Sequence, residues 1–236
     1  MDLVYGVSTV QDGNMSFRWG EENEVNENRN KFLKKIGVKK DECVCTSLVH
    51  GKEVVVVEAL DKGKTIEADG FITVDSRVAI FMLTGDCLPV VFFDKQRHVL
   101  GMAHLGWRGV DKELARAMVE NLIRVGSDPR DLWLWIGPGV RKETYWKYGK
   151  GVPEFKKSVD LDKWGRFLED KPDGQLALDL VGFVKYQVQK LGVMGEKIEV
   201  SSSDTVIDRN YFSQFRSDKL GQPQGRFATV AMMKNR

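Results

Sequence analysis

The stretch VAIFMLTGDCLPVVFFDKQRHVLGMAH, residues 78–104, decides the fold. Its apolar runs predict three buried strands, at residues 78–83, 90–93 and 98–104. The polar group DKQR at residues 94–97 predicts a tight turn that joins the second and third strands as a hairpin. A hairpin inside a chain whose strands and helices otherwise alternate favours mixed sheets over a purely parallel sheet.

Outward from this stretch, apolar residues at helical spacing predict three helices that each end just before a glycine. They cover residues 26–36, 110–125 and 178–191. β-branched and apolar runs predict further strands at residues 54–58, 71–73, 132–136, 197–200 and 226–233. The stretch up to residue 24 is polar and predicted to be irregular. The sequence therefore predicts an α/β sandwich with mixed sheets.

Composition narrows the class of protein. The chain has 236 residues, 42% hydrophobic and 30% charged, with no Pro/Gly/Ser-rich linker, so residues 1–236 are predicted to form one domain. A net charge of only +2 argues against nucleic-acid binding, and no apolar run is long enough for a membrane span. Three cysteines without a leader-like N-terminus make a cytoplasmic protein the expectation.

Histidine is scarce: the chain has three, of which His50 and His104 adjoin glycine-rich turns, while His98 is typical of a surface hairpin. If Asp94 faces Arg97 across the turn, the same register puts Cys87 opposite His104, with Cβ atoms roughly 4.5–5.5 Å apart. One cysteine and two histidines are the donor set of a catalytic zinc site, with the fourth position open. The alternative is that Cys87 is a small buried apolar residue and both histidines are core groups.

Two charged residues lie next to these donors in the sequence. Arg108 follows His104 by four positions and is suited to hold a phosphate or carboxylate, unless it only packs on Trp107. Asp86 precedes Cys87 and is a candidate proton acceptor or a partner of a metal ligand, unless it only caps a turn. Asp86, Cys87 and Arg108 are therefore the predicted catalytic residues.

A late segment interleaves aromatic residues with arginines. The block YFSQFR at residues 211–216 precedes GRF at residues 225–227. Such a pattern can stack a flat ring and hold an anion. It makes Phe212, Arg216 and Arg226 candidate substrate-binding residues beside Arg108, although a plain strand–turn–strand with half-buried aromatics has the same spacing.

Several short motifs together carry a family resemblance. They are VHG at residues 49–51, ADGFIT at 68–73, TGDCLP at 84–89, AHLGWRG at 103–109, IGPG at 136–139, FSQFR at 212–216 and GR at 225–226. The chain resembles the YfiH-type proteins, also called laccase-domain, multicopper polyphenol oxidase-like or DUF152 proteins, over nearly its full length. This resemblance implies an α/β/β/α sandwich, similar to the fold of a deamidating bacterial toxin, and His50, Cys87 and His104 as metal ligands.

For activity, the resemblance implies purine nucleoside chemistry. Adenosine, inosine, guanosine and methylthioadenosine would be split by phosphate, and adenosine would also be deaminated, with zinc as the cofactor. The sequence departs from the family pattern at Leu48, where glutamine is usual, and at 203–205, where Ser-Asp-Thr replaces Cys-Thr. Both departures concern substrate contacts and leave the three expected metal ligands in place. The oligomeric state stays open.

Three other functions compete with this expectation. A copper phenol oxidase needs many imidazole ligands, and this chain has three histidines. A metal-free cysteine hydrolase would use Cys87 as nucleophile and His104 as base, with a role in peptidoglycan amino-acid editing as one possibility. A non-enzymatic partner-binding protein with a structural zinc would have no open coordination position facing a pocket.

Overall fold

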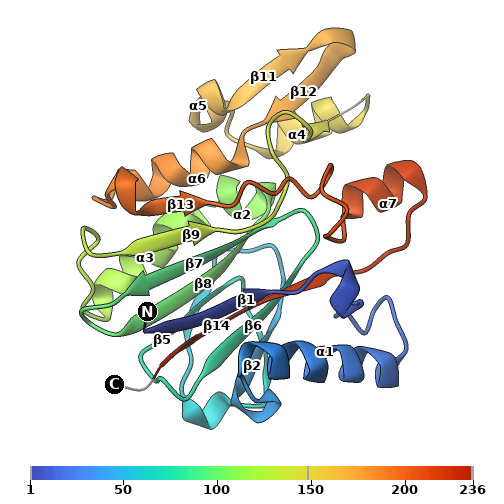
Figure 1. The fold of residues 1–236 in the computed structure, drawn as a ribbon. Coiled ribbons are helices and arrows are strands. Elements are labelled where there is room, and N and C mark those ends of the chain that lie inside the picture. Colours follow the sequence, from blue (N-terminus) through green and yellow to red (C-terminus); the bar gives the residue numbers. More distant parts are fainter. Residues whose placement is uncertain (1, 148, 235–236) are drawn as a thin grey trace.

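Two large sheets packed face to face form the centre of the fold (Figure 1). The computed structural model describes residues 2–147 and 149–234. One sheet has five strands in the order β1-β14-β6-β2-β4, and the other has six in the order β13-β9-β7-β8-β5-β3. A small sheet of three strands, in the order β10-β12-β11, lies beside them.

In the middle of the chain, the observed strands agree closely with the strands predicted from the sequence. The five-stranded sheet contains β1 (Leu3–Val7), β14 (Phe227–Met233), β6 (Ala79–Thr84), β2 (Cys43–Ser47) and β4 (Thr65–Glu67). The six-stranded sheet contains β13 (Ile198–Val200), β9 (Trp133–Ile136), β7 (Leu88–Asp94), β8 (Val99–Leu105), β5 (Gly70–Thr73) and β3 (Val54–Val56). The small sheet contains β10 (Trp146–Lys147), β12 (Gln175–Leu178) and β11 (Leu168–Lys171). Both large sheets combine parallel and antiparallel pairs, as predicted.

Helices cover the outer face of each large sheet. The helices of the described chain are α1 (Glu22–Ile36), α2 (Trp107–Asp111), α3 (Leu114–Arg124), α4 (Gly151–Ser158), α5 (Leu161–Trp164), α6 (Leu180–Gln189) and α7 (Gln214–Leu220). Helix α1 packs on the five-stranded sheet, whereas α2, α3 and α6 pack on the six-stranded sheet (Figure 1). The layers run helix, sheet, sheet, helix, so the expected α/β/β/α sandwich is confirmed.

Side-chain alternation explains why the central strands are apolar without interruption. In β7, Val90 and Phe92 face the helices, while Val91 and Phe93 face the other sheet. In β6, Ile80 points toward the opposite sheet, and its neighbours in the sequence point toward α1. Because both faces of these strands are buried, their positions are apolar except at the last residues, Thr84 of β6 and Asp94 of β7.

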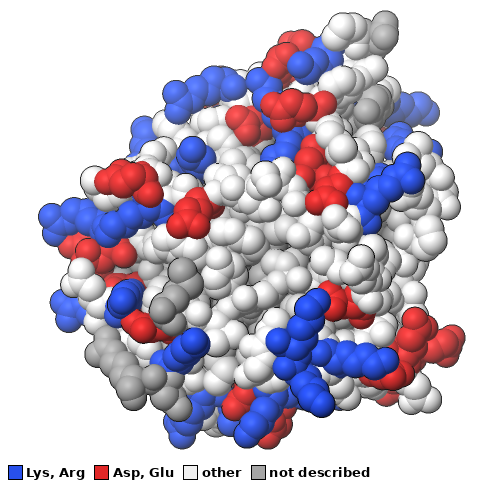
Figure 2. Space-filling model, in the orientation of Figure 1, with Lys and Arg blue, Asp and Glu red and all other residues white. Residues whose placement is uncertain are grey.

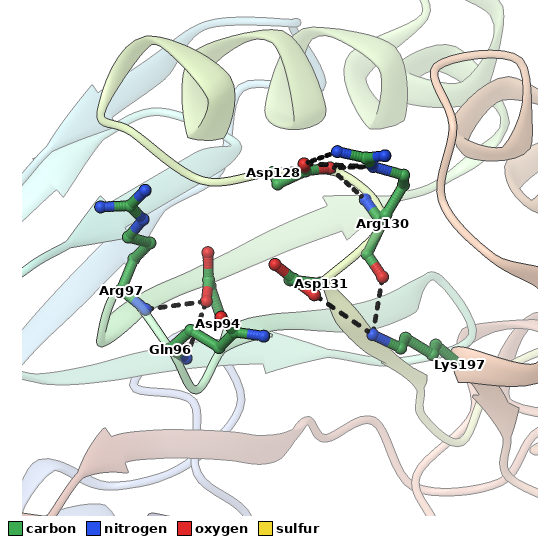
Figure 3. A network of polar contacts seen from close by, with 7 residues as sticks. All are labelled: Asp94, Gln96, Arg97, Asp128, Arg130, Asp131 and Lys197. Carbon is green, nitrogen blue, oxygen red and sulfur yellow. Dashed lines mark hydrogen bonds and ion pairs between the residues drawn. The ribbon is translucent and has the colours of Figure 1, made fainter.

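The β7–β8 hairpin forms in a register different from the predicted one (Figure 3). Asp94 pairs with Val99 and not with Arg97. Its Oδ1 accepts hydrogen bonds from the backbone N–H groups of Gln96 and Arg97, each at 2.9 Å. The buried carboxylate thus folds over the turn's own amides, which places Arg97 and His98 inside a longer loop.

This register moves the opposite partner of His104 by two residues. Pro89 lies opposite His104, and Cys87 precedes the first residue of β7. The prediction that Cys87 and His104 are directly opposed was therefore wrong. They are diagonal neighbours on the same side of the hairpin, because side chains alternate with a period of two.

Ion pairs fix the loop before β9 next to the hairpin turn (Figure 3). Asp128 binds Arg130, with 2.5 Å between Oδ2 and the guanidinium nitrogen, and Lys197 Nζ lies 3.7 Å from Asp131 Oδ1. Lys197 also donates to the Arg130 carbonyl at 2.6 Å. These contacts hold the ends of β9 and β13, which pair in parallel, at one edge of the sheet.

The predicted helix at residues 110–125 is two helices. It breaks after α2, where Glu113 adopts a left-handed conformation with φ of 61°. At the break the Val110 carbonyl accepts from the Glu113 N–H at 3.0 Å and also from Gln187 Nε2 of α6 at 2.7 Å. Apolar spacing continues across the break, so the sequence pattern did not reveal it.

The N-terminal stretch, predicted to be irregular, contains a strand. β1 pairs antiparallel with β14 from the other end of the chain, with Leu3 opposite Met233. Across residues 2–147 and 149–234, no helix has both the length and the apolarity to cross a membrane. Basic and acidic side chains are interspersed around the edge of the face seen in Figure 2.

We expect Leu100→Ala to lower the free energy of unfolding by about 2–5 kcal/mol, because Leu100 lies at 0% exposure between the two sheets. The matched control is Leu60→Ala, the same change at a side chain that is 70% exposed, where the loss should stay below about 0.5 kcal/mol. Urea unfolding followed by circular dichroism measures both. Equal losses for the two variants would contradict the assigned core.

Candidate metal centre

Three separate parts of the chain bring the predicted donors together. His50 lies in the loop between β2 and β3, Cys87 in the turn between β6 and β7, and His104 near the end of β8. Their donor atoms all lie within 4.8 Å of one another. Two ligands bound to one zinc ion at about 2.0–2.3 Å can be at most about 4.6 Å apart, so this cluster could close on one metal ion with little movement.

His104 is oriented by a buried carboxylate. Its Nδ1 lies 3.0 Å from Asp69 Oδ1, and neither side chain is exposed by more than 4%. If Nδ1 carries the proton, Nε2 keeps its lone pair on the side of the cluster. Metal-binding histidines commonly have such a carboxylate partner.

The same carboxylate also holds the loop that carries His50. Asp69 Oδ2 accepts from the backbone N–H of Gly51 at 2.7 Å and from that of Val49 at 3.2 Å. In the sequence, Asp69 is assigned no role beyond a turn and a family motif. The one sequence signal that could have indicated its role is its position just before the predicted strand at residues 71–73.

The pKa values of the two histidines are shifted in opposite directions by their surroundings. Burial alone would lower the pKa of His104, but the neighbouring Cys87 and Asp69 raise it to about 9. Burial and the adjacent His104 ring lower the pKa of His50. Burial would raise the pKa of Asp69, but its hydrogen bonds from His104 and Gly51 outweigh burial and lower it. The ionised Asp69 carboxylate beside His104 therefore favours a cation at the donors.

A glycine makes room for the sulfur. A Cβ atom on Gly106 would lie 2.6 Å from Cys87 Sγ, well inside van der Waals contact. The residue that opens α2 must therefore be glycine if Cys87 is to keep this position.

The cluster opens into a cleft with a volume of about 360 Å³. His50 is exposed and Cys87 is half-buried, whereas His104 forms the buried base. Other lining residues are Trp107, Arg108, Tyr145, Lys147, Gln214 and Phe215. Hollows of similar size lie elsewhere on the surface, but among the described residues only this one contains the three converging donors.

Of the charged residues predicted nearby, Arg108 reaches the cleft and Asp86 is largely enclosed. The Arg108 guanidinium lies 4.2 Å from the centre of the Trp107 ring, so it both packs on Trp107 and lines the cleft. Asp86 accepts from Thr205 Oγ1 at 2.7 Å and from the Phe215 N–H at 2.6 Å. Burial raises the pKa of Asp86, although these hydrogen bonds oppose the shift.

The late aromatic–arginine segment is arranged differently from the predicted contacts. Arg216 is buried, and its guanidinium donates to the carbonyls of Asp208 and Tyr211. Phe212 packs against Gly225, where an added Cβ would meet its ring at 2.4 Å. The cleft is instead lined from α7, by Phe215 among others.

Arg226, the third predicted contact of this segment, lies next to the cleft. Its side chain packs over Gly85, where an added Cβ would meet it at 2.9 Å, and its guanidinium donates to Gln214 Oε1. Gly85 and Gln214 both line the cleft. Arg226 therefore contacts two residues that form the cleft wall.

The two departures from the family pattern also have structural roles. Leu48 packs against the core between the sheets, in the loop that leads to His50. Thr205 supplies the hydroxyl that binds Asp86. Both residues therefore contribute to the structure around the cleft.

A histidine–cysteine–histidine cluster at the base of an open cleft, with an arginine on its wall, is the arrangement of a metal-dependent enzyme centre. The comparisons agree with this class. The chain belongs to the family described as multi-copper polyphenol oxidoreductase laccase, which matches residues 4–234. The resemblance to YfiH-type proteins is thereby confirmed.

Relatives and solved structures extend the comparison. A purine nucleoside phosphorylase of Deinococcus radiodurans is 29% identical over 180 residues, which cover 76% of this chain and 68% of the relative. A purine nucleoside phosphorylase of Mycobacterium tuberculosis is 27% identical, over 88% of this chain and 78% of the relative. The crystal structure of YlmD from Geobacillus stearothermophilus superposes with a TM-score of 0.87 at 24% identity, covering 99% of this chain and 93% of that one. Bacillus licheniformis YfiH gives 0.84 at 25% identity, over 94% and 85%.

We predict that Asp69→Asn weakens binding of Zn²⁺, used as the probe, by roughly 10- to 100-fold, because an uncharged amide has one acceptor oxygen and cannot accept from both the His104 ring and the loop amides. Competition with a fluorescent chelator measures the affinity. The control is Asp75→Asn, which removes an exposed pairing with Arg77 away from the cleft and should leave Zn²⁺ affinity unchanged. Unchanged affinity in Asp69→Asn would contradict the assigned role of the carboxylate.

Gly106→Ala should also reduce Zn²⁺ binding, because the added methyl group either displaces the Cys87 sulfur or costs about 1–3 kcal/mol of strain. Elemental analysis after purification gives the zinc content per chain. Gly151→Ala is the matched control, since a Cβ there meets no atom within 4 Å. Full zinc occupancy and wild-type affinity in Gly106→Ala would contradict the close packing of Cys87 on Gly106.

Proposed function

We propose that this protein is a zinc-dependent purine nucleoside phosphorylase that acts on adenosine, inosine, guanosine and methylthioadenosine, and that it can also deaminate adenosine. The observation that carries the proposal is the donor set of His50, Cys87 and His104, within 4.8 Å of one another at the base of an open cleft. Relatives named purine nucleoside phosphorylase over 76% and 88% of the chain support the substrate class.

Zinc suits these donors better than a multicopper centre does. A cysteine and two histidines supply three protein ligands and leave one position open, as in catalytic zinc sites. The third histidine, His98, lies in the hairpin turn at the far end of β8. A blue copper centre together with a copper cluster would need more imidazoles than the chain contains.

The proposed reaction is a displacement at the ribose. A phosphate oxygen forms a bond to C1′, the bond from C1′ to the purine nitrogen breaks, and its electron pair leaves with the purine, which takes up a proton. The products are the free base and ribose 1-phosphate, or 5-methylthioribose 1-phosphate from methylthioadenosine. When bound, zinc would supply a Lewis acid to the cleft.

The residues of the cleft wall have distinct tasks in this proposal. Arg108 holds the phosphate by its guanidinium, which matches two phosphate oxygens at once. Phe215 and Tyr145 offer aromatic surface to the purine. Arg226 assists indirectly, because it fixes Gln214 of α7. The buried position of Arg216 supports a role in holding the chain before α7 rather than a direct substrate contact.

Deamination needs a group that moves a proton, because water adds to the purine ring and ammonia leaves. Asp86 is the candidate from the sequence. Both of its carboxylate oxygens accept hydrogen bonds from Thr205 and Phe215, and this supports a positioning role for Asp86 in the present structure. We therefore propose phosphorolysis as the main reaction and deamination as the secondary one.

One observation favours a second candidate, the cysteine hydrolase. Cys87 Sγ lies within 4.8 Å of a ring nitrogen of His104, and Nδ1 of that ring faces Asp69, so the three residues are also arranged as a nucleophile, a base and a carboxylate. This arrangement and a metal site exclude each other, because the same sulfur and nitrogen lone pairs would bind the ion. A structural zinc in a partner-binding protein fits less well, since the donors line a cleft.

We expect purified protein to convert inosine and phosphate to hypoxanthine, and adenosine to adenine and some inosine, as measured by liquid chromatography. Cys87→Ala should lose bound zinc and activity together, because it removes a donor. Cys45→Ala, at a half-buried thiol of β2, is the control and should keep both. Release of no base or inosine from any of the four nucleosides would end the proposal. Activity that survives zinc removal but is abolished by thiol alkylation would favour the hydrolase.

A further inference from the structure

A second cation, which the sequence did not single out, lies beside Arg108 in the cleft. Lys147 ends the short strand β10, and its Nζ is 5.2 Å from the centre of the Trp107 ring. The Arg108 guanidinium lies against the same ring at 4.2 Å. Lys147 is also 5.1 Å from the Tyr145 ring centre and donates to the Tyr145 hydroxyl at 3.3 Å. Aromatic surfaces thus hold both cations at the cleft.

Neither cation has a carboxylate partner in the part of the chain that the structure describes, since no ion pair there involves Arg108 or Lys147. Away from the cleft, lysines at the small sheet do have carboxylate partners. Glu169 of β11 pairs with both Lys142 and Lys171. Lysines of this sheet therefore pair with carboxylates where the cleft is not involved.

The carboxylates that line the cleft are already engaged. Asp86 is hydrogen-bonded on both oxygens, and Asp218 accepts from the amide groups of Gln214 and Gln224. Burial and the charge of Arg108 lower the pKa of Lys147. Two like charges that share an apolar wall repel each other, and an anion placed between them removes this cost.

We propose that Lys147 and Arg108 together form a subsite for a phosphate group on the wall of the metal cleft, with Trp107 as its floor. The forked guanidinium of Arg108 and the ammonium group of Lys147 can donate to different oxygens of one phosphate. Because Cys87 lines the same cleft, the subsite lies beside the proposed zinc donors. The occupant we assign is inorganic phosphate, and this assignment rests on the proposed phosphorolysis.

Direct binding tests the subsite without any turnover. Isothermal titration of the zinc-loaded protein with inorganic phosphate should give binding that Lys147→Gln weakens by roughly 10- to 100-fold, the value of one charge-assisted hydrogen bond. Lys171→Gln is the matched control, a lysine of the same small sheet at 5.8 Å from the Trp146 ring that is paired with Glu169. Its phosphate affinity should equal that of the wild type. Equal affinity in Lys147→Gln and wild type overturns the proposal.

A nucleotide could carry the same chemistry on its 5′-phosphate, so the titration is repeated with adenosine and with adenosine 5′-monophosphate. If phosphate is the occupant, Lys147→Gln weakens phosphate and leaves adenosine unchanged. If the monophosphate alone binds in a Lys147-dependent way, the subsite holds a phosphate group but inorganic phosphate is not its occupant, and the assigned role in phosphorolysis is overturned.

Kinetics then links the subsite to the reaction. With inosine as substrate, Lys147→Gln should raise the KM for phosphate roughly 10-fold or more, while the KM for inosine and the zinc content stay unchanged. Lys147→Arg should recover part of the loss, because it restores the charge. A rise in the KM for inosine alone would contradict the assignment. If the wild type splits no nucleoside, the proposed function fails, and the phosphate titration still decides the subsite.

Discussion

One buried carboxylate holds two of the three donors of the metal cluster. Asp69 lies at 0% exposure, and its two oxygens bind different segments: Oδ1 faces His104 of β8, and Oδ2 accepts from the loop backbone on both sides of His50. His50 has a φ of 56°, a left-handed conformation that costs free energy for a residue with a side chain. The hydrogen bonds to Asp69 fix this conformation, and they also offset the cost of burying the carboxylate.

The third donor is placed by the geometry of the hairpin. Cys87 lies before β7, diagonal to His104, and its sulfur fits against a glycine. The predicted register was off by two residues, yet it put Cys87 on the correct side, because a shift of two preserves the face of a strand. A shift of one residue would have turned the thiol into the opposite layer. The site was therefore predictable from side-chain alternation even though the turn was not.

The parts of the fold that were predicted share a local cause, and those that were missed depend on distant partners. Uninterrupted apolar runs predicted β6, β7 and β8, because a strand that is buried on both faces has apolar residues at consecutive positions. β1 was missed because its pairing with β14 joins the two ends of the chain. The helix break at Glu113 was missed because one of its contacts comes from Gln187, far along the sequence, which donates to the Val110 carbonyl at the break.

The two sides of the cleft also differ in whether local sequence or distant contacts determine them. The metal donors come from short motifs on neighbouring strands, so a few residues fix their positions. The opposite wall comes from α7 and the small sheet, and long-range bonds such as Asp86 to Phe215 hold it in place. The sequence singled out Phe212 and Arg216 in this block and not Phe215, and it is the packing that places Phe215 at the cleft. A substitution in α7 or in the small sheet can therefore change this wall while the donor cluster stays in place.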